Sequence, residues 1–402
     1  MKKIAFALCV VLLLQTVGCS KAFMPPEASD SGDVYEHVPP ESPPDAVIGE
    51  EQTPADLLPA PVKLSASDLS DILDAIDLTE ASLTYHREAE TTYPADAAIR
   101  AESYLDEFKS LAFVAYTLPD EWDGNVDDFM RLTTPDVTII SPQRGYGDNR
   151  LLYLMTENSE GWFILPYEQD EPNRMYWQIY SNFFSWYEEA KAASLFGGTG
   201  TPLTAAELDY FEEYTTSIWT EYDAEWGGYI GGSTEISCFF TSHYSDPRDM
   251  DANAFLAYCP VRSTLIIDDE EDEEEWQLVQ KVINFRSGED NPVISLDDLP
   301  VPCHRHRRTE INELLTTYAG ITVEEMHTDW TSEAQYVPET DSFYTFTSDF
   351  GPGRFIPCYG EKNGDIVTLW AAPDNYDDTA NMLTLQKSGE NWRILSHEAV
   401  NW

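Results

Sequence analysis

The sequence predicts an α+β protein made of tandem small domains, each with helices followed by an antiparallel β-meander. Apolar residues recur at helical spacing after residue 64, and short strand-like runs follow them. Turn-forming residues separate these runs, most clearly at Asn363-Gly364, a dipeptide typical of tight hairpins. Hydrophobic residues make up 42% of the chain and aromatic residues 13%, which excludes a disordered acidic protein and favours packed cores.

The first α+β domain is expected at 65–195. Ser65 is placed to cap a helix whose apolar positions repeat at helical spacing from Leu69 to Ile76. A second helix is expected to start at Pro94, because proline suits the first turn of a helix. Strands are expected at 137–140, 151–155 and 162–165. A third helix, over 176–193, carries an aromatic stripe whose spacing favours core packing over a sugar-stacking platform: Trp177, Tyr180, Phe184 and Tyr187.

Further segments follow a glycine-rich linker at 196–202. Residues 203–267 are expected to be mainly helical, and Thr204 and Glu207 form a capping-box pattern at their start. Residues 268–275 are eight consecutive acids and are interpreted as an acidic linker. Residues 276–402 are expected to form helices followed by a β-meander domain. One of these helices should be capped by Thr309 and stopped by Gly320, and the strands are expected at 343–347, 355–359, 366–371, 382–386 and 392–396.

Two hairpins have the same sequence pattern. In each, an apolar strand and a polar turn lead into Trp-x-Ile-Leu, beginning at Trp162 in one hairpin and at Trp392 in the other. Alternate residues of a strand share a face, so both tryptophans are expected to face a core. This repeated pattern is consistent with a duplicated module or with chance similarity between hairpins.

The N-terminus indicates export. Lys2 and Lys3 precede an apolar run that is too short for a transmembrane helix, a pattern typical of a signal peptide at 1–18. Gly18-Cys19 after this run resembles a bacterial lipobox. That resemblance implies that Cys19 becomes the first mature residue and carries a diacylglycerol on its sulfur. Ordinary cleavage after Ala22, which would give a secreted protein, is the alternative.

Residues 19–64 are interpreted as a disordered, acidic, proline-rich tether. Prolines and like charges both extend a chain, so this segment is suited to hold a folded part away from a membrane. The expected location is the extracellular face of the cytoplasmic membrane, with lipid anchoring.

The formal net charge of -50 limits the partners. Nucleic acid is excluded as a partner, because its phosphates would be repelled. Docking on anionic lipid headgroups is disfavoured for the same reason, which leaves the N-terminal lipid as the contact with the membrane. A surface protein or a glycan remains as the expected partner.

Six cysteines are present, and Cys9 leaves with the signal peptide. With Cys19 assigned to the lipid, four remain, and four cysteines allow three pairings between which sequence cannot choose. Free buried thiols are an equal alternative to bridges. The four are Cys238, Cys259, Cys303 and Cys358.

The stretch from Cys238 to Leu256 carries a family resemblance. A run of aromatic residues leads through Tyr244-x-x-Pro247-x-Asp249-x-Asp251 into an apolar helix. The chain resembles uncharacterised secreted lipoproteins of anaerobic Gram-positive bacteria, over roughly residues 203–402. This family has no established activity, so the resemblance implies an exported lipoprotein and no catalytic residues.

One cluster of metal-ligating side chains is considered. Cys303, His304 and His306 offer three zinc donors, and Cys358 a fourth. Neighbouring and alternate residues of one segment rarely all face one ion, and Arg305 adds like charge. A basic hinge that pairs with the acidic run is therefore preferred, and no metal or other cofactor is expected.

The usual catalytic signatures are missing from the sequence. It contains no nucleophile elbow, phosphate loop, Cys-x-x-Cys or dinucleotide glycine motif. Paired carboxylates suffice for glycoside hydrolysis, but 73 acids single out no pair. The sequence thus favours a non-catalytic, lipid-anchored surface module that binds a macromolecule. The alternative is an extracellular hydrolase of glycan or peptide that uses carboxylates not identifiable from sequence.

Overall fold

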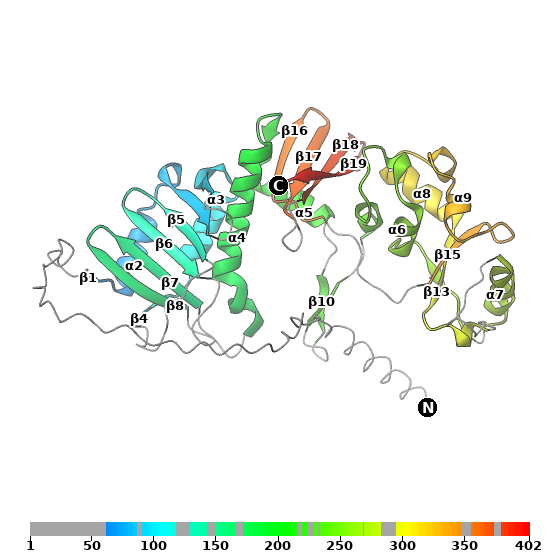
Figure 1. Ribbon diagram of the computed structural model, residues 1–402, viewed down its shortest axis with the longest axis horizontal. Coiled ribbons are helices and arrows are strands. Elements are labelled where there is room, and N and C mark those ends of the chain that lie inside the picture. The colour runs from blue at the N-terminus through cyan, green and yellow to red at the C-terminus, as the bar shows by residue number, and fades with distance from the viewer. Residues whose placement is uncertain are drawn as a thin grey trace, which may run out of the picture. The chain divides into compact units, whose positions relative to one another are not determined.

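The computed structural model has an α+β fold with antiparallel sheets, as predicted (Figure 1). The signal peptide and nearly all of the expected tether lie outside the described residues, and the first described element is strand β1 (Val62–Lys63). The structure describes residues 62–86, 91–117, 129–142, 150–165, 172–215, 219–223, 228–231, 234–267, 269–282, 295–346, 355–373 and 379–402.

The first sheet has eight strands in the order β1-β8-β7-β6-β5-β2-β3, with β4 also paired to β8. Strand β1 runs parallel to β8, whereas the pairs β4–β8, β5–β6, β6–β7 and β7–β8 are antiparallel. The predicted strands at 137–140, 151–155 and 162–165 are confirmed. The remaining strands are β2 (Ser82–Tyr85), β3 (Thr92–Pro94), β4 (Val114–Tyr116), β5 (Phe129–Thr133), β6 (Val137–Pro142), β7 (Arg150–Thr156) and β8 (Ser159–Leu165).

Three α-helices accompany this sheet: α2 (Ala66–Asp74), α3 (Ala101–Ser110) and α4 (Pro172–Phe196). Short 3-10 turns lie at Leu78–Glu80 and Ala95–Ala97. The predicted cap is confirmed, because Ser65 forms a capping box with Asp68. The second helix was predicted to start at Pro94, which is wrong. Pro94 ends the edge strand β3, where the missing N–H of proline costs no ladder hydrogen bond.

Helix α4 contributes to two cores. Of the predicted aromatic stripe, Tyr187 is buried in the first core and Phe184 packs against it partly buried, which confirms core packing for its described part. Phe183 and Trp186 are buried in the same core, with residues of β2, β5 and α3. The side chains of Trp177 and Tyr180 lie outside the described residues. At the other end of the helix, the Phe196 ring stacks on Trp370 of the second sheet, with centroids 5.4 Å apart. The first and second sheets therefore share this helix.

The second sheet has five strands in the order β19-β18-β17-β16-β9. The predicted Asn363-Gly364 turn is confirmed: it joins β16 to β17, and Gly364 has φ 62°, a value that L side chains rarely adopt. The strand predicted at 355–359 starts only at Tyr359, and Phe355 is a buried core residue before it. The strands are β9 (Thr201–Pro202), β16 (Tyr359–Asn363), β17 (Ile366–Ala371), β18 (Thr379–Ser388) and β19 (Asn391–Asn401).

In its described residues, the segment between β9 and β16 contains the helices α5 (Ala205–Thr215), α6 (Ala252–Ala257), α7 (Glu270–Val282), α8 (Arg308–Tyr318) and α9 (Trp330–Glu333). Its 3-10 turns lie at Ser237–Phe240, Pro247–Asp249, Leu296–Asp298 and Val323–Glu325. A small sheet has the order β12-β13-β15-β14, and β10 pairs with β11. These strands are β10 (Trp219–Asp223), β11 (Gly228–Gly231), β12 (Ser263–Thr264), β13 (Cys303–Arg307), β14 (Tyr336–Val337) and β15 (Ser342–Phe346).

Buried residues of α5, α6, α8 and the second sheet form one apolar cluster. Residues 203–267 and the β-meander near the C-terminus therefore share a core, although the sequence pattern assigned them to separate segments. Helix α8 starts at Arg308 with Arg307 before it, so Thr309 is not its cap. Its predicted stop is confirmed, because Gly320 has φ 73° and donates its N–H to Leu315 O at 2.9 Å.

Most of the expected acidic linker is helical. Residues 270–275 form the first turns of α7, where the helix dipole favours acidic side chains. The same helix buries Trp276 and Val279 in a small core with Cys303. The predicted pairing of the basic segment with the acidic run is confirmed at Arg305, whose Nη1 lies 2.7 Å from Glu275 Oε2.

The two tryptophan hairpins differ in orientation. In β8, Phe163 and Leu165 are buried in the core, and Trp162 is only half-buried on the opposite face, so its predicted core position is wrong. In β19, Trp392 packs against the core next to Phe211, with ring centroids 5.1 Å apart, and its predicted position is confirmed. The two strands with similar sequence patterns therefore turn opposite faces toward their cores: the face of Trp392 in β19, and the face without the tryptophan in β8.

Candidate functional site

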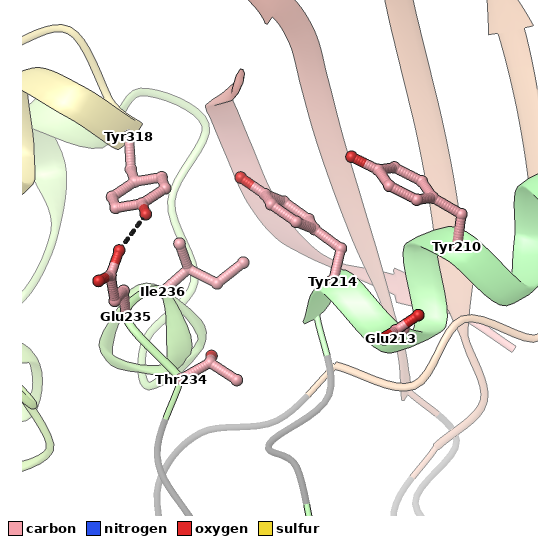
Figure 2. A pocket seen from close by; sticks show the side chains of 7 residues that line it. All are labelled: Tyr210, Glu213, Tyr214, Thr234, Glu235, Ile236 and Tyr318. Carbon is pink, nitrogen blue, oxygen red and sulfur yellow. Dashed lines mark hydrogen bonds between the residues drawn. The ribbon is translucent and has the colours of Figure 1, made fainter. Parts of the chain in front are cut away.

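A cleft of about 400 Å³ lies between helix α5, the segment 234–236 and the end of helix α8. Figure 2 shows rings projecting from α5 on one side and a tyrosine–glutamate pair on the other. We call this site the tyrosine cleft. It is lined by Tyr210, Glu213, Tyr214, Thr234, Glu235, Ile236 and Tyr318.

Helix α5 supplies one wall. Thr204 and Glu207 form the predicted capping box at its start, which fixes the first turn. Phe211 turns into the core, and Tyr210 and Tyr214, one helical turn apart, line the cleft together. Their rings are nearly parallel, with an interplanar angle of 12° and centroids 6.2 Å apart. Tyr210 is 45% exposed, so this pair presents aromatic surface to solvent.

The opposite wall is held by a hydrogen bond. The hydroxyl of Tyr318, the last residue of α8, donates to a carboxylate oxygen of Glu235 (Figure 2). Burial and the neighbouring Glu235 carboxylate raise the pKa of Tyr318. Burial, together with Tyr210, raises the pKa of Tyr214 to about 12. These two phenols therefore stay neutral at physiological pH. Each donates its one O–H within the protein, Tyr318 to Glu235 and Tyr214 to the backbone carbonyl oxygen of Trp392.

The charge of the cleft is negative. Glu213 and Glu235 line it, and no lysine, arginine or histidine is among its described lining residues. Within the described part of the chain, neither glutamate forms an ion pair. Faces of aromatic rings attract cations, and nearby carboxylates add to that attraction. The site is therefore chemically suited to a cationic group carried on an apolar stem.

A second aromatic hollow lies on the first sheet. Tyr116, Trp162 and Tyr153 are direct register neighbours on β4, β8 and β7, and the Tyr153 hydroxyl donates to Glu160. The hollow encloses about 370 Å³. Both Lys63 and Glu160 line this hollow, so its charge is mixed. It therefore favours a cationic ligand less clearly than the tyrosine cleft does.

The weak metal candidates lie on β13 and point in different directions. Cys303 is buried in the core around Trp276. On the other face of the strand, His304 Nδ1 lies 2.9 Å from Thr264 Oγ1, and His306 Nε2 lies 2.9 Å from Thr345 Oγ1. Cys358, the fourth candidate, packs instead in the cluster of Trp370 in the second sheet. The structure does not bring these four side chains together, and the described residues contain no other group arranged for a metal ion.

Sequence reasoning did not select the tyrosine cleft. Tyr210 and Tyr214 are spaced i, i+4 within a helix that the capping box predicts, so the sequence does indicate that these two rings lie on one face of that helix. Tyr318 lies one turn after the core residues Leu314 and Leu315 of its own helix, and it packs partly against the same core. Nothing local indicates that it faces α5, about a hundred residues earlier. Cys19, the predicted lipid site, lies outside the described residues.

No family model, curated protein or solved structure matches this chain. None of the helices in the described ranges is long and apolar enough to cross a membrane.

Proposed function

We propose that this protein is a lipid-anchored surface protein that binds a basic segment of another protein through the tyrosine cleft. The observation that carries the proposal is the set of aromatic rings at Tyr210, Tyr214 and Tyr318 beside two carboxylates, with no basic side chain among the described lining residues. A lysine or arginine side chain supplies both an apolar stem and a terminal cation, so it complements both features.

Long-range charge supports the same ligand. The net charge of -50 attracts basic partners and repels acidic ones. That attraction is not specific to one site, because acidic residues occur along the whole sequence. Specificity must therefore come from the cleft, where the aromatic rings are fixed by α5 and by the Tyr318–Glu235 hydrogen bond.

The test uses a short peptide with one central lysine and a matched peptide with norleucine, which has the same stem and no charge. Isothermal titration should show binding of the lysine peptide only. Replacing both Glu213 and Glu235 by Gln should weaken it about tenfold, or about 1.4 kcal/mol. This loss should shrink at high salt, because screening weakens exposed charge pairs. Tyr210→Ala with Tyr214→Ala should weaken binding at every salt concentration.

Glu313→Gln is the matched control, because Glu313 is an exposed acid on α8 outside the cleft. It should leave the affinity unchanged. An equal loss in Glu313→Gln would show that binding is only non-specific charge attraction. If a neutral glycan bound to the cleft and the Gln variants still bound it, the ligand would be a sugar and not a basic segment. Turnover of a glycan or peptide that depends on Glu213 or Glu235 would favour the alternative, an extracellular hydrolase.

The anchor is tested separately. The apolar run followed by Gly18-Cys19 supports lipid attachment at Cys19. One diacylated cysteine carries two acyl chains, which are enough for stable membrane binding. Cys19→Ala should leave an unprocessed precursor or release the protein from membranes, as read by fractionation and metabolic labelling with a fatty acid. A mature N-terminus at Phe23 would instead show that the protein is secreted without a lipid.

A further inference from the structure

Two of the four cysteines available for bridges lie in the same core. Cys238 is in the 3-10 turn Ser237–Phe240, and Cys259 follows helix α6. Their exposed fractions are 1% and 0%, and both are free thiols in the structure. The turn and the helix pack together, because the rings of Phe239 and Phe255 meet edge to face with centroids 5.1 Å apart. Each thiol is close enough to shift the pKa of the other. Cys303 and Cys358 belong to two other apolar clusters, apart from this pair and from each other.

We propose that Cys238 and Cys259 form a disulfide bond when the protein folds in an oxidising environment, and that Cys303 and Cys358 remain thiols. Four cysteines allow three complete pairings by sequence alone. The fold favours one bridge, because Cys238 and Cys259 lie in one core whereas Cys303 and Cys358 lie in two others. The bridge would tie the turn before α6 to the segment after it.

In the folded state, the four thiols differ in their tendency to ionise. Burial alone would raise the pKa of Cys259, but contacts with Cys238 and with the His306 imidazole outweigh burial and lower it. Burial raises the pKa of Cys303 to about 12 and also raises that of Cys358, which disfavours their thiolates. The thiolate is the attacking species in disulfide exchange, so the native surroundings favour reaction at Cys259 over reaction at Cys303 or Cys358.

The chemistry balances with an external disulfide such as oxidised glutathione. The Cys259 thiolate attacks one glutathione sulfur, which breaks the glutathione S–S bond and releases one glutathione thiolate. The Cys238 thiolate then attacks the Cys259 sulfur and releases the second glutathione. The protein loses two electrons and two protons, and the external disulfide is reduced to two thiols. Because both cysteines are buried in the folded state, glutathione reaches them during folding, before the core closes. At that stage either thiolate can attack first, and the two steps balance in either order.

The experiment refolds residues 20–402, which lack the signal peptide and Cys19, in a mixture of reduced and oxidised glutathione. The products are acid-quenched, alkylated in denaturant and digested. Mass spectrometry should find one linked peptide pair containing Cys238 and Cys259, with alkylated Cys303 and Cys358. Four alkylated cysteines, or a link that involves Cys303 or Cys358, would overturn the proposal. This measurement uses the wild-type chain, so it does not depend on any variant folding.

A second measurement tests whether the bond holds the native core. Thermal unfolding of the refolded protein should shift to lower temperature on reduction with dithiothreitol. The shift should be retained in Cys303→Ser with Cys358→Ser, and it should be absent in Cys238→Ala with Cys259→Ala. A shift that persists without Cys238 and Cys259 would assign the reducible bond elsewhere and contradict the pairing.

Discussion

Replacing Arg100 by Ala should lower the free energy of unfolding by about 3–5 kcal/mol, because it leaves a buried carboxylate without its cation. The side chain of Glu189, on α4, is 1% exposed. Arg100 reaches it twice, through Nη1 at 3.2 Å and through its backbone N–H at 3.0 Å. The Tyr104 hydroxyl donates a third hydrogen bond to it at 2.7 Å. Burial raises the pKa of Glu189, and the contacts with Tyr104 and Arg100 oppose that rise.

The same guanidinium joins two helices. Its Nε lies 2.8 Å from Asp209 and its Nη2 lies 2.5 Å from Glu212, both on α5. Loss of Arg100 should therefore loosen α5 against α4 as well as destabilise Glu189. Hydrogen exchange should show faster opening of α5 in Arg100→Ala than in the wild type.

Urea denaturation with two comparison variants measures the effect. Arg248→Ala removes an exposed pair with Asp246 and should cost at most about 1 kcal/mol. Arg100→Ala combined with Glu189→Gln should recover part of the loss, since the buried charge is gone. If Arg100→Ala costs no more than Arg248→Ala, the carboxylate is not held by this cation and the interpretation is wrong.

Acid should destabilise the fold through His397 by about 3 kcal/mol between pH 6.5 and pH 4. This imidazole is 3% exposed and packs among the rings of Phe240, Phe355 and Tyr244. Its Nδ1 lies 2.8 Å from the carbonyl oxygen of Ser242. Burial lowers the pKa of His397 to about 4; the hydrogen bond to Ser242 opposes this shift, and the nearby His243 adds to it.

The direction of the pH effect follows from proton binding. An unfolded histidine has a pKa near 6.5, so between pH 6.5 and 4 the unfolded state binds more protons at this position than the folded state. Stability therefore rises with pH through this window and is lost as the pH falls through it. Below pH 4 both states are protonated at this histidine, and its contribution stops changing.

The measurement compares stability curves rather than single values, since many carboxylates titrate near pH 4. The curve for His397→Gln should be flatter than the wild-type curve by about 3 kcal/mol over this range. His327→Gln, at a half-exposed position paired with Asp249, should keep the wild-type shape. Parallel curves for wild type and His397→Gln, or a titration midpoint of His397 near 6.5 by NMR, would contradict the prediction.

Local patterns were enough to predict many elements. The strand at Ile366–Ala371 has the predicted bounds, and the turn at Gly364 and the cap at Ser65 are where the sequence indicates. Each depends on residues within a few positions of each other, so the physical cause is contained in the segment itself. Pro94 shows the limit: proline fits both a helix start and an edge strand, and pairing with β2 decided between them.

The orientation of elements required the tertiary structure. Alternation along β8 shows that its two faces differ, but it does not show which face is inward, and Phe163 rather than Trp162 enters the core. The acidic run continues into α7, and two tertiary contacts hold this helix. Trp276 is buried in a small core, and Asp272 and Glu275 pair with Arg305, which is distant in sequence.

The sequence by itself determined the composition, the expected export signal and most local elements. The tertiary structure alone decided which distant side chains meet. Tyr318 faces Tyr214 across the cleft, Cys238 shares a core with Cys259, and Arg100 neutralises Glu189. In each case the partners lie on different elements, and their approach depends on how several helices pack around a shared core. Because that packing is a collective property of many side chains, no local spacing rule reports it.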